Sequence, residues 1–211
     1  MTPPVVGIVK VSATEAYRAN PSIINEALAI LASVPGTLGQ WHGLGIQDPE
    51  SLYFVNVWES AARREAFAQD TDTYARLAKA IGAAFDSAAP AWRYHVPFVV
   101  EPSKALSSPA TEFAVWRVKD GVDVEQFKPL VQRLHGLAAE RLGADVAAGS
   151  WGATLEDPRV FVVCIGWSSI EAYKTAAATQ KEIMGHIGEM MQIADLVEAK
   201  HAGLTRYSRG E

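Results

Sequence analysis

The chain has 211 residues and a formal net charge of −5, and 49% of its residues are apolar. This composition is typical of a folded globular protein, and the acidic balance argues against nucleic acid or an anionic membrane as the main partner. The single cysteine, Cys164, excludes an internal disulfide framework and a thiolate metal cluster.

Apolar periodicity and turn residues predict the elements of the first half. A β-branched run predicts a strand at 5–11. Asn20 and Pro21 then supply an N-cap and a first-turn proline for a helix that reaches Leu31. Beyond Gly36 the sequence predicts, in order, strands at 38–46 and 52–58, a short helix capped by Ser60, a helix starting at Thr71 or Asp72, and a strand at 91–99.

The second half predicts the same order of elements. These are a strand at 113–118, a helix along 127–137 with Asp123 as its cap, strands at 147–155 and 160–167, a short helix capped by Ser169, a longer helix along 183–194 and a strand at 197–207. Residues 100–111, with two prolines and three serines, are predicted to be a linker. We therefore expect one repeat at 1–99 and a second at 112–211.

Matched residues support a duplication. Asp48 with its following proline, Trp58 and Ser60 all recur 109 positions later, as Asp157 with its proline, Trp167 and Ser169. His95 falls opposite His201 after a small deletion. Each half has the order β-α-β-β-α-α-β, which is the split βαβ, ferredoxin-like plan with helices on one face of an antiparallel sheet. We expect an α+β fold in which the two bare sheet faces pair in one pseudo-symmetric barrel, with the helices outside and an apolar cavity between the sheets.

Three segments carry a resemblance to a known family: FVNVWES at 54–60, VCIGWSS at 163–169 and FAVWRVKDG at 113–121. They resemble the dimeric α+β barrel superfamily, in particular the antibiotic-biosynthesis-monooxygenase-like and stress-responsive barrel domains, in tandem form. The similar families include cofactor-free monooxygenases, polyketide cyclases, haem-degrading enzymes, aldoxime dehydratases and chlorite dismutase-like proteins. The resemblance implies the fold of nearly the whole chain and leaves the activity open, because activity depends on the site.

Strand alternation places Phe54, Asn56 and Trp58 on one face, and the resemblance implies that this face lines the cavity. The matching face of the second half carries Phe161, Val163, Ile165 and Trp167. His42 and Asn56 are polar on faces that are otherwise apolar. His42 has the pKa range of a general acid or base, and Asn56 could donate a hydrogen bond to a developing oxyanion. The alternative is that both are satisfied polar groups of the core.

In the fourth strand, Trp92 and Tyr94 lie on one face and His95 on the other. If the first two face the cavity, Tyr94 is the expected proton donor. His95 and His201 then tie down the last strand of each repeat; the alternative is an acid/base group at each end of the cavity.

The chain has six tryptophans, which either pack the sheets against the helices or form a pocket for a flat hydrophobic ligand. On the second interpretation the ligand-binding residues are Phe54, Trp58, Trp92, Trp116, Trp151 and Trp167. His186, beside two methionines, raises a haem alternative, with His95 or His201 as other axial ligands. The resemblance argues against haem, because no histidine occurs in the helices that directly follow Trp58 and Trp167.

Several cofactor motifs are missing from the sequence: a dinucleotide or Walker loop, a zinc-protease helix and a serine-hydrolase elbow. We therefore predict a cofactor-independent enzyme that acts on a small aromatic, polyketide-like or terpenoid molecule by acid/base chemistry, through cyclisation, elimination or monooxygenation. The alternatives are a non-catalytic ligand-binding or stress-associated barrel, and a haem-binding barrel. We expect no metal, no nucleic acid or membrane partner, and a monomer or weak homodimer. Residues 1–4 show no secretory signal, which predicts a cytoplasmic location.

Overall fold

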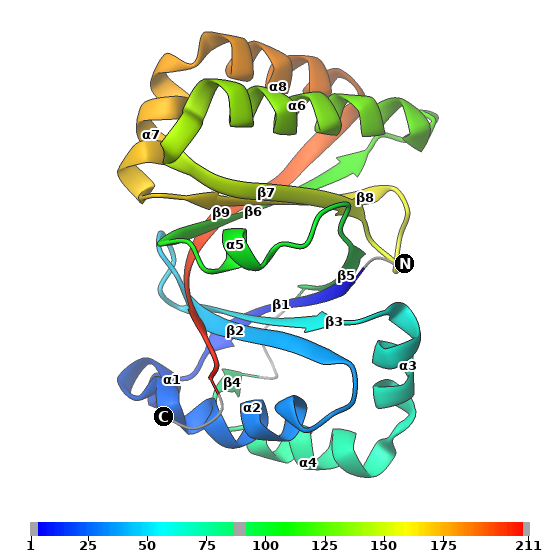
Figure 1. The fold of residues 1–211 in the computed structure, drawn as a ribbon, viewed down its shortest axis with the longest axis vertical. Helices are drawn as coiled ribbons and strands as arrows, with labels where there is room; N and C mark the ends of the chain where they lie inside the picture. Colours follow the sequence, from blue (N-terminus) through cyan, green and yellow to red (C-terminus); the bar gives the residue numbers. More distant parts are fainter. Residues whose placement is uncertain (1–3, 87–91, 209–211) are drawn as a thin grey trace. The chain divides into compact units, whose positions relative to one another are not determined.

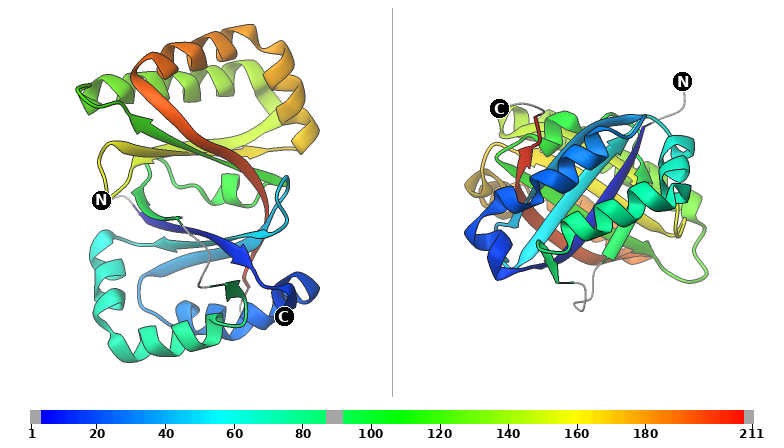
Figure 2. Two further views of the ribbon diagram at one scale, coloured as in Figure 1. Left: turned by 180° about the vertical axis from the view of Figure 1, so that it is seen from behind. Right: turned by 90° about the horizontal axis from the view of Figure 1, so that it is seen from below.

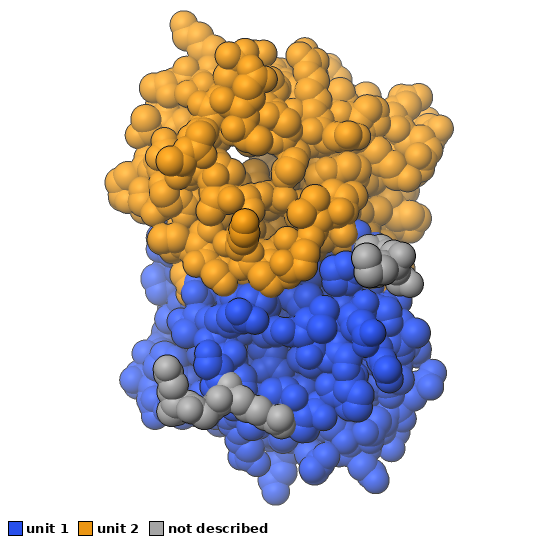
Figure 3. Space-filling model, viewed as in Figure 1, with its two compact units in different colours: residues 1–97, 204–211 blue, residues 98–203 orange. Residues whose placement is uncertain are grey.

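The computed structural model describes residues 4–86 and 92–208 (Figure 1). Residues 1–3, 87–91 and 209–211 lie outside this description. They include most of the segment read for a secretory signal, and Ala91, the expected start of the fourth strand. The chain forms two compact units (Figure 3). Unit 1 comprises residues 1–97 and 204–211, and unit 2 comprises residues 98–203.

The elements of unit 1 follow the predicted order, with an additional short helix near the start (α1) and an additional two-residue strand after α4 (β4). They are β1 (Val5–Ala13), α1 (Glu15–Ala19), η1 (Pro21–Ile24), α2 (Asn25–Ala32), β2 (Thr37–Gly45), β3 (Ser51–Trp58), α3 (Ala61–Gln69), α4 (Thr71–Ile81), β4 (Phe85–Asp86) and β5 (Trp92–Pro97). The predicted caps are confirmed: the side chain of Asn20 accepts a hydrogen bond from the backbone N–H of Ser22, and that of Ser60 accepts one from Arg63.

Unit 2 repeats this order. It contains α5 (Ser103–Leu106), β6 (Ala110–Val118), η2 (Val124–Gln126), α6 (Phe127–Leu142), η3 (Gly143–Asp145), β7 (Val146–Ala153), β8 (Val160–Trp167), α7 (Ile170–Thr179), α8 (Lys181–Ile193) and most of β9 (Ala194–Arg206). Asp123 caps η2, which leads into α6, and Ser169 caps α7. The segment predicted as a linker thus includes helix α5, whose Ala105 and Leu106 are fully buried.

Among the described residues, the strands follow the order β4-β1-β3-β2-β9-β6-β8-β7, with β5 also on β1. Neighbouring strands are antiparallel, as in β1 with β3 and β6 with β8. In each unit the long helices cover one face of the sheet (Figure 2). The predicted α+β class and the tandem of two ferredoxin-like repeats are therefore confirmed. None of the described helices has both the length and the apolar character that crossing a membrane requires.

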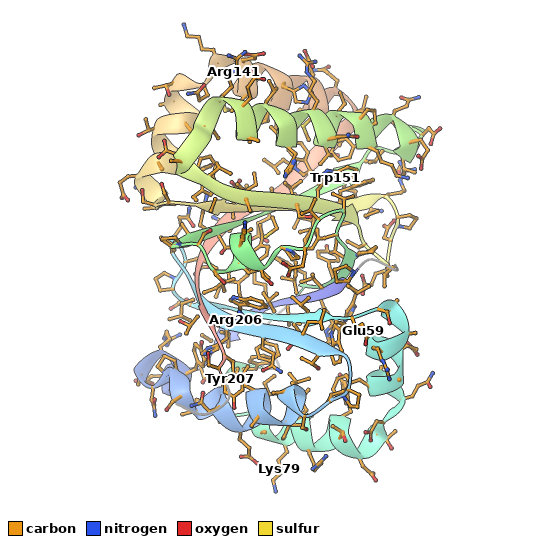
Figure 4. All side chains as sticks on the ribbon, viewed as in Figure 1. Glu59, Lys79, Arg141, Trp151, Arg206 and Tyr207 are labelled. Atoms are coloured by element: carbon orange, nitrogen blue, oxygen red, sulfur yellow. The ribbon has the colours of Figure 1, made fainter. Side chains whose placement is uncertain are left out.

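The end of each repeat belongs to the other compact unit. Residues 98–203 form unit 2, and within it the backbone N–H groups of Val99 and Val100 donate to Trp151 O and Ser150 Oγ of β7. Residues 204–211 belong to unit 1, where the Tyr207 N–H donates to Gln40 O of β2 at 2.9 Å. The Arg206 guanidinium lies 5.2 Å from the centre of the ring of Trp41, which is also in β2; Figure 4 labels Arg206.

The strand faces expected to line a cavity between the sheets pack instead against the helices of their own unit. In unit 1, Phe54 and Trp58 share a core with Leu28 and Leu31 of α2. In unit 2, the matching strand residues pack with α6: Phe161, Val163 and Trp167 lie in one core with Phe127, Val131 and Leu134. The alternation was correct and the choice of face was wrong. Every residue of β3 is buried, so this strand has no solvent-exposed side that would show which face packs against the helices.

Alanine substitution of two glycines tests how tightly α5 packs on β8. Gly166 lies at this contact, and Gly136 in α6 is the control. A Cβ added at Gly166 would lie 2.7 Å from the Cα of Ala105, whereas one added at Gly136 in α6 meets no atom within 4 Å. We expect Gly166→Ala to lower the free energy of unfolding by about 1–3 kcal/mol through overpacking. Gly136→Ala should raise it by about 0.5–1 kcal/mol, because a helix interior favours alanine. Urea unfolding of both variants measures this, and a neutral Gly166→Ala would contradict the packing.

Candidate functional site

A buried carboxyl group lies on the helix-facing side of the unit 2 sheet. Glu112 is in β6, and its residue is 7% exposed. The indole Nε1–H of Trp167 donates to Glu112 Oε2 at 2.8 Å. Trp167 ends β8, and the Ser169 cap starts α7 two residues later. The described residues provide no hydrogen-bond donor to the other carboxylate oxygen, Oε1. One oxygen is therefore held in place by the indole, and no described donor fixes the other.

Two further groups from other elements surround this carboxyl. His201 of β9 is the cross-strand partner of Glu112, and its Nε2 lies 3.8 Å from Glu112 Oε2. Tyr173, in the first turn of α7, places its ring 4.2 Å from the His201 ring and 5.4 Å from the Trp167 ring. The end of β8, the middle of β9 and one capped helix thus converge on Glu112.

Burial shifts the proton affinities of these groups in different directions. It raises the pKa of Glu112 to about 7, although the hydrogen bond from Trp167 favours the ionised form. Burial lowers the pKa of His201 to about 4, so this imidazole is neutral at pH 7. Burial also raises the pKa of Tyr173, and the nearby Glu112 carboxylate adds to that effect. At neutral pH, therefore, Glu112 exchanges between its two forms beside two neutral groups.

A cavity of about 440 Å³ opens between α6 and β7 in the same unit. Figure 3 shows the surface of unit 2 hollowed there. Its walls are mainly apolar and include Leu134, Ala138, Val163 and Ile165. Ile165 is directly opposite Glu112 in the β6–β8 register, so these two side chains are neighbours on one face. The carboxyl therefore lies one strand inward from the floor of the cavity.

His135 of α6 borders this cavity. Its Nε2 lies 2.7 Å from Gly149 O, within hydrogen-bond distance, and the ring occupies the space that a Cβ at Gly149 would need. The absence of a side chain at Gly149 therefore lets the imidazole reach β7.

Unit 1 has a different set of groups at the equivalent positions. Gly7 stands where unit 2 has Glu112, since Gly7 opposes Asn56 and His95 as Glu112 opposes Ile165 and His201. Arg64 Nε donates to His95 Nε2 at 3.1 Å. Unit 1 therefore retains the histidine and lacks the carboxyl.

The expected acid/base residues of unit 1 do not form a single group. His42 lies on the helix-facing side, where the Tyr17 hydroxyl is 2.6 Å from its Nδ1, and burial lowers the pKa of His42. Asn56 lies on the same side, opposite Gln40. Tyr94 lies on the other face of the sheet, where its ring stacks on Trp92 at 5.2 Å. Tyr94 and Trp92 are therefore separated from His42 and Asn56 by the sheet itself.

The remaining aromatic residues named from the sequence lie in the helix-facing cores. Trp116 and Trp151 pack in the core of unit 2, and Figure 4 shows Trp151 between β7 and α6. Sequence reasoning missed Glu112, Tyr173, Tyr17 and Gln40. One signal was available for Glu112, because it is a charged residue that alternates with the apolar Ala110, Ala114 and Trp116 on one face of β6. Tyr17 and Tyr173 come from helices, and strand alternation says nothing about them.

Comparison with solved structures identifies the fold. A candidate monooxygenase from Lactobacillus acidophilus NCFM matches with a TM-score of 0.68 at 17% identity, covering 99% of this chain and 97% of that chain. An anthrone oxidase-like protein matches with a TM-score of 0.71 at 13% identity, covering 100% and 95%. A haem-binding protein from Thermus thermophilus matches with a TM-score of 0.53 at 11% identity, covering 96% and 91%. No protein-family model matches the chain, and no curated protein matches its sequence.

The chain shares its fold with these structures, which match it over nearly its whole length. The fold that the sequence resemblance implied is thereby confirmed. At these identities the likeness concerns the fold alone, so the chemistry has to be argued from the residues.

The three histidines considered for haem each have contacts within the protein. His186 Nδ1 lies 2.9 Å from Glu189 Oε2 in the same helix, and its Nε2 lies 2.8 Å from Leu130 O, which links α8 to α6. His95 Nε2 accepts the Arg64 hydrogen bond, and His201 is covered by the Tyr173 ring. Among residues 4–86 and 92–208, no cluster of three or more His, Cys, Asp or Glu side chains could hold a metal ion.

The raised pKa of Glu112 predicts a pH dependence of stability. The pKa is 4.5 in the unfolded chain and about 7 in the folded protein, so the stabilisation is complete below pH 4.5 and is lost as the pH rises through 7. The loss amounts to about 3 kcal/mol. Denaturant unfolding near pH 5 and pH 8 should show this loss in the wild type and not in Glu112→Gln. His201 changes stability in the opposite direction, so the comparison with the variant is essential. Equal pH dependence in both proteins would contradict the assignment.

Proposed function

We propose that the protein is a cofactor-independent enzyme that removes a proton from a small hydrophobic molecule bound in unit 2, with Glu112 as the general base. The observation that carries this proposal is the buried Glu112 carboxyl, whose pKa of about 7 places both protonation states within reach beside an apolar cavity. A general base works best when its pKa is near the operating pH.

The surrounding residues support this role in three ways. Trp167 fixes one carboxylate oxygen, which leaves Oε1 for the substrate proton. The neutral His201 provides no cation that would lower the basicity of the carboxylate. Tyr173 keeps its phenolic proton and could donate a hydrogen bond to an oxygen on which negative charge develops. The mainly apolar lining of the cavity lowers the polarity around a bound molecule, and this strengthens each of these interactions.

The cavity favours an aromatic, polyketide-like or terpenoid substrate, because its lining is mainly apolar and its volume suits a small molecule. Cyclisation, elimination and cofactor-free monooxygenation of such molecules can each begin with removal of a proton, and the proposal is made for that common step. The likeness to a candidate monooxygenase and to an anthrone oxidase-like protein agrees with this range of reactions.

A second candidate function is reversible binding of a small molecule without reaction. It is favoured by the same cavity, with Glu112 then serving only as a polar anchor. The acid/base roles of His42 and Asn56 remain a further proposal for unit 1. Tyr94 has no part in it, because it lies on the opposite face of the sheet.

Hydrogen exchange of the substrate distinguishes an enzyme from a binding protein even when the reaction product is unknown. The protein is incubated in D₂O with a panel of small aromatic and terpenoid ketones, and deuterium incorporation at carbon is followed by mass spectrometry. We expect incorporation with the wild type and a rate about 10²–10⁴-fold lower with Glu112→Gln, because the base is removed. Glu171→Gln, on the exposed face of α7, is the matched charge control and should retain the wild-type rate. A full rate with Glu112→Gln would refute the proposal, and a recovered ligand of unchanged mass would favour the binding alternative.

The pH profile gives an independent check on the base. Because the carboxylate form is the active one, kcat/KM should rise with pH to a plateau, with a midpoint near the Glu112 pKa of about 7. A profile flat from pH 5 to pH 9 would contradict the assignment.

A further inference from the structure

Unit 1 contains three polar side chains with buried atoms that lack hydrogen-bond partners among the described residues. The atoms are Thr37 Oγ1, both carboxamide atoms of Gln40, and Asn56 Oδ1. Gln40 is 2% exposed and Asn56 is 8% exposed. Buried polar atoms are nearly always paired in native proteins, so each of these atoms requires an explanation.

The three residues form one cluster on the helix-facing side of the sheet. Gln40 of β2 is directly opposite Asn56 of β3, and Thr37 is opposite Trp58, two residues further along β3. Phe54 and Trp58 mark this face as the one packed against the helices. His42 is two residues from Gln40 on the same face, and burial lowers its pKa, so it adds no positive charge at pH 7.

The fold itself does not require polar residues at these positions. The equivalent residues of unit 2, in the same strand register, are Val146, Gly149 and Ile165. All three line the cavity of unit 2. The unpaired polar atoms of unit 1 therefore lie where the other repeat has a ligand-sized hollow.

We propose that Thr37, Gln40 and Asn56 form a second binding site, in unit 1, for an uncharged small molecule that presents a hydrogen-bond donor beside an acceptor, as a lactam or a carboxamide does. This inference goes beyond the proposed function and is independent of Glu112. Gln40 Nε2 donates to the ligand carbonyl while Gln40 Oε1 accepts from the ligand N–H, which gives two parallel hydrogen bonds. In a primary carboxamide, which carries a second N–H, Asn56 Oδ1 accepts this second donor, and the Thr37 hydroxyl lies at the end of the row. A charged ligand is disfavoured, because none of the three side chains is ionised and a buried charge without a partner is costly.

The test is a titration of ¹⁵N-labelled protein, followed through the side-chain NH₂ signals of Gln40 and Asn56. The probe is 2-pyrrolidinone, and the matched control is cyclopentanone, which has the same ring size and no donor. We expect a saturable shift of both signals with 2-pyrrolidinone and at least tenfold weaker binding of cyclopentanone. Gln40→Leu should weaken 2-pyrrolidinone binding at least tenfold. The same variant should unfold at a higher urea concentration, because it removes two unpaired polar atoms.

Two control variants keep the test decisive. Gln69→Leu, at an exposed position of α3, should leave binding unchanged, and so should Glu112→Gln in unit 2. If Gln40→Leu does not fold, the near-isosteric Thr37→Val and Asn56→Leu replace it, with the same expected loss of binding. The inference is overturned if 2-pyrrolidinone gives no saturable shift, if cyclopentanone binds equally well, or if the folded cluster variants bind as the wild type does. The cluster would then hold ordered water only.

Discussion

Among the described residues, the buried Glu112 carboxyl has one hydrogen bond, from Trp167, and no cation beside it, and the proposed chemistry of unit 2 depends on this. The group that faces it, His201, is itself buried and therefore neutral, so neither group stabilises a charge on the other. The Trp167 indole supplies the single directed contact, and that indole is positioned by the end of β8 and the capped helix that follows. The folded protein loses stability when a carboxyl held in this way ionises. Proteins retain such a carboxyl mainly where its shifted pKa serves a function.

The two repeats share one fold and carry different polar groups at equivalent positions. Unit 2 has a carboxyl at 112 and small or apolar residues at 146, 149 and 165, next to an open cavity. Unit 1 has glycine in place of the carboxyl and carries threonine, glutamine and asparagine at the other three positions. The tryptophan at the end of the third strand and the histidine of the last strand occur in both units. The two proposals follow this difference, with proton transfer in unit 2 and recognition by neutral hydrogen bonds in unit 1.

Most of the fold could be predicted from the sequence because local signals were strong. The Ser60 and Ser169 caps fixed two helix starts, and the β-branched run fixed β8 to the residue. The duplication then predicted the fold class, because two copies of one αβ unit can be arranged in only a few ways. Helix α1 was missed because it has only five residues, and no apolar period is visible over so short a stretch.

The candidate site was harder to predict for a physical reason. Alternation shows which side chains share a face, and it does not show which layer covers that face when both faces are apolar. His42 and Asn56 were correctly placed together, whereas Tyr94 was joined to them although it lies on the opposite side. Glu112 appears as an ordinary charged residue in the sequence. Only its burial and its contact with Trp167, which is 55 positions away, distinguish it.

The most direct test of this account is a ¹³C NMR titration of the Glu112 side-chain carboxyl, assigned by difference from Glu112→Gln. The account predicts a midpoint near pH 7, because burial opposes ionisation. A midpoint near the ordinary value of 4.5 would show that the carboxyl is solvated and would contradict its role as the base of unit 2.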